Sequence, residues 1–180
     1  SNAVFVNGVW INTATDLYTG LAPDGTERVR VHIGERTENP DGTVTLTALR
    51  YEDLTGTHPD VLLGQVTLAA AQPAPDPTPG GGGTTPTPEP HDPAIARWHA
   101  FALRASGPSD VPAQPVAAPA ADGTTVTERA DEAGDGATGQ LRVDGVTVRS
   151  ASDRGEVRLE RVVLYPGTSI AGELRDVRVR

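Results

Sequence analysis

Residues 141–180, LRVDGVTVRSASDRGEVRLERVVLYPGTSIAGELRDVRVR, contain the spacing that decides the fold. One pattern occurs there three times: an aliphatic residue, two other residues, a valine, one residue and a second aliphatic residue. The copies are Val143–Val148, Leu159–Leu164 and Leu174–Val179, and they begin 16 and 15 residues apart. Turns that contain glycine or serine separate them. Short, regular spacing of aliphatic residues predicts β-strands that each bury one face.

Two arrangements fit this C-terminal repeat. Stacked coils of a short parallel β-helix would bury each aliphatic row against the next one. An ordinary antiparallel meander also places strands at regular spacing. The third copy ends at Val179, and an uncapped repeat leaves a strand edge open. We therefore expect further coils in a longer protein, a partner chain on that edge, or cover from the N-terminal strands.

The stretch VRLERVVLYPGTSIAG at residues 157–172, followed by Leu174–Val179, carries a resemblance to known proteins. It resembles β-helix segments of large bacterial proteins linked to phage-tail or contractile-injection-type particles. The resemblance covers residues 141–180 and consists mostly of aliphatic spacing. It implies a structural or surface-recognition part of an assembly and assigns no catalytic residue.

The N-terminal region, residues 4–71, is predicted to be an antiparallel meander that forms half of a sandwich or a small barrel. Val29, Val31 and Ile33 alternate with polar residues, as in a strand with one buried face. Three further segments are strand-like: Val4–Ile11, Thr43–Tyr51 and Val61–Leu68. Pro-Asp-Gly-Thr occurs at residues 23–26 and 40–43, and this sequence favours a tight turn before a strand.

The remaining segments divide the chain. Ser1-Asn2-Ala3 is typical of the remnant of a cleaved expression tag. Residues 72–93 contain eight prolines and a run of four glycines, which indicates a linker or a surface loop before a C-terminal β region at 94–180. Apolar spacing after Asp92-Pro93 predicts one short helix near residues 94–105. A strand that starts at Arg97 is the competing interpretation.

Composition excludes several kinds of chemistry. All 15 basic residues are arginine, and the chain has no cysteine or methionine. Without lysine there is no phosphate-loop lysine or Schiff base, and without cysteine there is no thiolate metal site. A formal charge of -9 disfavours nucleic acid and anionic membrane surfaces as partners. No apolar run approaches the ~18 residues of a membrane-spanning helix, so we expect no transmembrane segment here and leave the compartment, extracellular, particle-associated or cytoplasmic, open.

Candidate site residues are few. Sugar-binding β modules display aromatic platforms, and Trp10, Tyr18 and Tyr51 are the candidates for that role. Packing in the core is the preferred alternative for each of them. The acidic stretch with Asp131, Glu132 and Asp135 has the oxygen ligands of a weak calcium loop but not the ligand spacing. The four histidines lack metal-ligand spacing, so neither a metal site nor a cofactor is expected.

Three functions follow from these patterns. The first is a non-enzymatic structural or adhesive module of a larger bacterial assembly, tail-like or surface-exposed, whose partners are other subunits or the rest of a parent protein. The alternative is a carbohydrate-binding β module with a glycan partner. The third is a hydrolase that uses Ser, His and Asp, for which Ser169 would have to meet a histidine.

Overall fold

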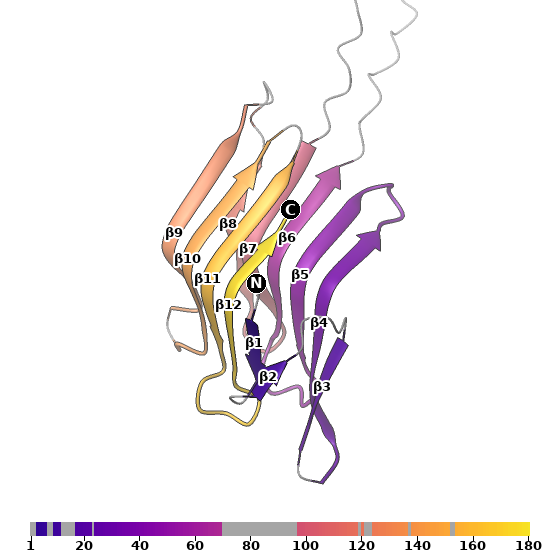
Figure 1. Ribbon diagram of the computed structural model, residues 1–180, viewed down its shortest axis with the longest axis vertical. Coiled ribbons are helices and arrows are strands. Elements are labelled where there is room, and N and C mark those ends of the chain that lie inside the picture. Colours follow the sequence, from indigo (N-terminus) through magenta and orange to yellow (C-terminus); the bar gives the residue numbers. More distant parts are fainter. Residues whose placement is uncertain are drawn as a thin grey trace, which may run out of the picture.

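The computed structural model describes residues 3–6, 9–11, 17–22, 24–69, 97–118, 120, 124–136, 138–151 and 154–180. Every regular element in this part of the chain is a β-strand (Figure 1). The strands are β1 (Ala3–Val6), β2 (Val9–Ile11), β3 (Leu17–Leu21), β4 (Glu27–Glu38), β5 (Val44–Asp53), β6 (Asp60–Ala69), β7 (Arg97–Ser106), β8 (Val111–Ala117), β9 (Val126–Gly134), β10 (Leu141–Ser150), β11 (Gly155–Leu164) and β12 (Gly172–Val179).

The strands form two antiparallel sheets that pack face to face. Sheet A has the order β2-β1-β12-β11-β10-β9, and sheet B has the order β3-β4-β5-β6-β7-β8. Strand β10 packs on β7, β11 on β6 and β7, and β12 on β5 and β6. The described strands are therefore a sandwich of two open sheets, and not a closed barrel.

A single hydrophobic core lies between the sheets. It contains Val31 and Leu63 from sheet B together with Val143 and Leu159 from sheet A, all fully buried. Strand β6 pairs with β7, so sheet B contains strands from both sides of the Pro/Gly-rich segment. The two β regions of the sequence thus share one core, while residues 72–93 lie outside the described residues.

The C-terminal repeat is an antiparallel meander, so the parallel β-helix expected as one alternative is wrong. Strands β10, β11 and β12 pair antiparallel in order. In this register the first aliphatic residue of one copy lies opposite the central valine of the next: Leu159 is opposite Val177, and Val162 is opposite Leu174. The pattern therefore reflects cross-strand pairing. Strand β1 covers part of β12, as the third alternative for the open edge expected.

The two residues between the first aliphatic residue and the valine of each copy lie at a kink in the middle of the strand. Gly145 has a φ of 63° and Asp176 a φ of 55°, so both are in the left-handed region. Around them two consecutive residues face outward: Asp144 and Gly145 separate the buried Val143 and Val146. Alternation of side chains along a strand has a period of two, so the kink shifts which residues face the core.

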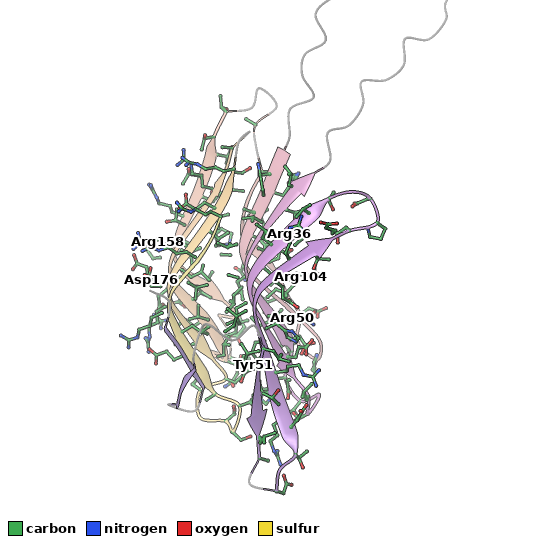
Figure 2. All side chains as sticks on the ribbon, turned by 45° about the vertical axis from the view of Figure 1, so that its right-hand side comes forward. Arg36, Arg50, Tyr51, Arg104, Arg158 and Asp176 are labelled. Atoms are coloured by element: carbon green, nitrogen blue, oxygen red, sulfur yellow. The ribbon has the colours of Figure 1, made fainter. Side chains whose placement is uncertain are left out.

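Sheet B carries the same kink with the opposite sense. Gly34 in β4 and Gly64 in β6 have φ values of 69° and 59°. In sheet B the residues at the kink face the core: Ala102 and Leu103, two consecutive residues of β7, are both fully buried. At the kink, the additional residue of the alternating pattern therefore projects outward from sheet A and inward from sheet B. Because sheet B faces the inner side of sheet A, these two directions are the same in space. Figure 2 shows both sheets bowed the same way.

The short helix predicted near residues 94–105 is wrong over its described part, because residues 97–105 belong to β7. The kink explains the error. It places Ala102 and Leu103 on the same side of the strand as Trp98, and this spacing imitates a helical period. In the structure, Leu103 pairs with Leu63 of β6 and Ala100 pairs with Val66.

Replacing Gly34 and Gly64 by alanine, one at a time, should distinguish the free-energy cost of the left-handed backbone from the cost of crowding in the core. Gly34→Ala adds a Cβ in open space, so it should cost only the left-handed conformation, about 1–2 kcal/mol. Gly64→Ala places its Cβ 3.1 Å from Ala48 Cβ and 3.4 Å from Val179 Cγ1, and the crowding should add about 1 kcal/mol or more. Urea denaturation measures both free energies of unfolding. Equal losses would contradict the tight packing at the inward kink.

Candidate functional site: a carboxylate junction and two charged faces

A buried carboxylate organises the loop between β5 and β6. The side chain of Asp53 is 0% exposed. Its oxygens accept hydrogen bonds from the backbone N–H groups of Thr55, Thr57 and His58, at 2.8, 2.9 and 2.6 Å. The Thr55 hydroxyl donates to both carboxylate oxygens, at 2.6 and 2.8 Å. The carboxylate therefore satisfies backbone donors that the tight loop leaves without strand partners.

The pKa of Asp53 results from opposing effects. Burial by itself raises the pKa, because it disfavours the charged form. The hydrogen bonds from Thr55 and His58 outweigh burial and hold the pKa below its ordinary value of 3.8. Asp53 is consequently a carboxylate at neutral pH. Its stabilising effect is present above about pH 4 and is lost as pH falls through the folded-state pKa.

Two tyrosines join the two sheets beside this loop. Tyr51 of β5 donates its hydroxyl to the carbonyl of Ile170, in the loop between β11 and β12. Tyr165, at the start of that loop, donates to the carbonyl of Pro59 in the β5–β6 loop. The two contacts are reciprocal, since each sheet supplies one tyrosine and one carbonyl. Burial, followed by the charges of nearby aspartates, raises the pKa of Tyr165, so its hydroxyl remains a donor.

His58 completes this junction. Its ring centroid lies 4.7 Å from that of Tyr165, and the rings are tilted by 50°. Its Nδ1 lies 3.3 Å from Asp53 Oδ2. An Asp–His pair of this kind orients the imidazole in hydrolases. Here, however, the same carboxylate oxygen also receives loop N–H groups and serves the loop conformation.

An ion-pair network covers the outer face of sheet B (Figure 2). Arg50 of β5 binds Glu35 of β4 through two hydrogen bonds, of 3.0 and 2.8 Å, and also bonds Glu52. His32 lies between the same two carboxylates, with Nε2 3.2 Å from Glu52 and Nδ1 3.4 Å from Glu35. The hydrogen bond from Arg50 holds the pKa of Glu35 below its usual range. The charges compensate one another, so the face attracts no ion of a single sign.

The outer face of sheet A places like charges directly opposite each other. Arg158 is opposite Arg178, and Arg161 is opposite Arg175. Like charges in such positions are destabilising. Glu173 Oε1 bridges the second pair at 3.1 and 2.9 Å, and Asp176 Oδ1 lies 2.8 Å from Arg178 and 4.0 Å from Arg158. The kink supplies the latter bridge, because it turns Asp176 to the outer face.

The structure places the predicted aromatic platforms as follows. Tyr51 is 1% exposed and part of the core, as the preferred alternative of core packing expected, so its ring is not displayed on the surface. Trp10 pairs with Phe5 in sheet A, and Tyr18 pairs with Val31 in sheet B. The side chains of Trp10 and Tyr18 lie outside the described part of the structure. The three residues come from three different strands, β2, β3 and β5.

The residues of the weak calcium-loop candidate do not converge in the described part of the structure. Asp131 and Glu132 lie within β9, and Glu132 pairs with Arg142 at 3.2 Å. Asp135 follows the strand and accepts hydrogen bonds from Thr138 and from the Gln140 backbone within its own turn. Over the residues that the structure describes, no group of three His, Asp or Glu side chains is placed to hold a metal ion.

Ser169 lies in the loop that Tyr165 begins. Hydrogen bonds from Thr168 N to the Tyr165 carbonyl and from Ala171 N to the Thr168 carbonyl, at 3.2 and 3.3 Å, close two turns there. This is a loop between antiparallel strands, and not the strand–turn–helix that a nucleophile elbow requires.

The sequence analysis missed the Asp53 junction, although a signal for it exists. Asp24 and Asp41 each accept a hydrogen bond from the N–H of a threonine two residues later, as the Pro-Asp-Gly-Thr turns predicted. Asp53-Leu54-Thr55 repeats the Asp-x-Thr spacing without the proline or the glycine at those positions. No comparable signal identifies Tyr51 and Tyr165 as links between the sheets, because their hydrogen bonds join residues 119 and 106 positions apart.

Comparisons with known proteins add no assignment, since no family model, curated protein or solved structure matches the chain. Within the described ranges, the structure has no helix long and apolar enough to cross a membrane.

We expect Asp53→Asn to destabilise the fold by about 2–3 kcal/mol, because an amide group would meet the loop's buried N–H donors. Asp41→Asn is the matched control. Asp41 makes the same type of hydrogen bond to Thr43, at 2.9 Å, but in an exposed turn, and its loss should cost below about 1 kcal/mol. Chemical denaturation measures both variants. Similar losses would show that burial of Asp53 is unimportant.

The low pKa of Asp53 also predicts a pH dependence. The unfolded chain takes up the proton near pH 3.8 and the folded chain only at lower pH, so acid favours unfolding. The difference in unfolding free energy between the unmodified chain and Asp53→Asn should be largest near neutral pH and shrink below about pH 4. Urea titrations at several pH values test this. A difference that stays constant down to pH 2 would contradict the role of the charged carboxylate.

Proposed function

We propose that this chain is a non-enzymatic structural or adhesive β module of a larger bacterial assembly, of the tail-like or surface type. The observation that carries this proposal is the incomplete pairing of strand β12 in sheet A. Strand β1 pairs with Gly172–Arg175 of β12. Beyond Arg175, β11 is the one described strand that pairs with β12.

The polar clusters support the same proposal. The Asp53 carboxylate holds a loop, the two tyrosines join the sheets, and Glu173 and Asp176 separate pairs of like charges. Each cluster stabilises the sandwich itself. Both outer faces carry compensated charges, which suit a module that is held among other proteins and does not capture a charged small molecule.

Sedimentation in the native host tests the module proposal. An antibody raised against this chain should detect the native protein in fast-sedimenting particle fractions of a gradient. The purified chain on the same gradient marks the position of the free molecule. Native protein found only at that position would overturn the proposal.

A further inference from the structure

The edge of sheet A at residues 176–179 of β12 has a described partner strand on one side only. It lies beyond the last pair between β1 and β12, Ala3 with Arg175. Among the described strands, only β11 pairs with this half of β12, through Val177, Arg178 and Val179. A strand edge of this kind presents N–H and C=O groups to an incoming chain.

The other edges of the two sheets carry features that oppose strand addition. Strand β8 has Pro112 and Pro115, which lack N–H donors. Strand β9 has four charged residues among its nine: Glu128, Arg129, Asp131 and Glu132. Strands β2 and β3 are short, with three and five residues, and β3 is bulged at Gly20.

The second half of β4 is protected by charge. Arg36 lies opposite Leu46 and Glu38 opposite Val44, so both charged residues occupy the row of the inward-facing side chains. They form an ion pair of 2.6 Å. Charged residues in the inward row and a kink, here at Gly34, are devices that keep an edge strand from pairing.

Strand β12 also has a kink, at Asp176, and charged residues in its outward row, but its inward row beyond the kink holds valines and no charged residue. Val177 is 5% exposed, and Val179 is partly buried against the core. An incoming strand with aliphatic residues beside these two valines would extend the apolar surface between the sheets. The inward row therefore selects aliphatic side chains.

The outward row selects an acidic side chain. Arg178 lies directly opposite Arg158, and the two arginines share one carboxylate: Asp176 lies 2.8 Å from Arg178 and 4.0 Å from Arg158. Figure 2 labels Arg158 and Asp176. A carboxylate on the free side of Arg178 would add an opposite charge across the strands, which is favourable. Charge complementarity and the apolar row together define the occupant.

We propose that residues 176–179 bind an extended segment of another protein chain, which adds to sheet A as a strand and carries an acidic residue between two aliphatic ones. This inference rests on the proposed role as a module of an assembly and names the contact that such a module uses. The main chain of the partner supplies hydrogen bonds, and the alternating side chains supply specificity.

A peptide titration tests this inference. The probe is acetylated, amidated Thr-Val-Glu-Val-Thr, added to the isotope-labelled chain while amide NMR shifts are recorded. Shifts should concentrate at Val177, Arg178 and Val179. The same peptide with lysine in place of glutamate should bind about fivefold or more weakly. A version N-methylated at the glutamate and the next residue should not bind, because it cannot pair with the main chain.

Variants of exposed arginines give the matched control. Arg178→Glu should reverse the preference, so that the lysine peptide binds better than the glutamate peptide. Arg104→Glu makes the same charge change on the outer side of sheet B and should leave the preference unchanged (Figure 2). The chain without Ser1 and Asn2, the residues before β1, should show the same shifts with equal or greater affinity.

Three outcomes would overturn the inference: no binding at millimolar peptide, shifts centred on β4, β8 or β9, or equal binding of the two peptides. These outcomes are distinct from failure of the module proposal. A native protein found in particles together with a silent peptide titration would refute the β12 contact alone. A native protein found only as the free molecule would refute the module.

Discussion

The mid-strand kink is the constraint on which the rest of the structure depends. It requires left-handed backbone at Gly34, Gly64, Gly145 and Asp176, and it runs across both sheets. Because the extra residues project in one direction in space, both sheets bow together and keep a common core. Had only one sheet been kinked, the sheets would have separated over half their length and left the interior poorly packed.

The kink also determines where polar groups lie. It turns Asp176 outward between two arginines, and in sheet B it brings position 64 so close to its neighbours that an added Cβ would lie 3.1 Å from Ala48 Cβ. At the end of the sandwich formed by the β5–β6 and β11–β12 loops, the Asp53 carboxylate and the two tyrosines connect the sheets. The sandwich is thus held by apolar packing along the strands and by hydrogen bonds between the sheets, which also include one from the Ser150 hydroxyl to the Trp98 carbonyl.

Edge protection links this architecture to function. Proline in β8, charge in β9 and charge in the inward row of β4 each oppose pairing with another chain. The half-covered β12 edge differs from them because valines fill its inward row. A module that protects most of its edges and leaves one apolar edge suits a directed contact within an assembly.

The sequence by itself determined the β class, the Asp-Gly-Thr turns and the aliphatic pattern of the C-terminal strands, since these follow from local propensity and periodicity. The same spacing also recurs at Leu63, Val66 and Leu68 of β6, where the sequence analysis did not recognise it. Only the tertiary structure decided that the repeat is antiparallel, that residues 97–105 form a strand, and that Tyr51 is buried. Each of these three outcomes depends on which strand lies beside the segment. A kink displaces the aliphatic pattern by one residue, and the displaced pattern fits more than one neighbouring strand.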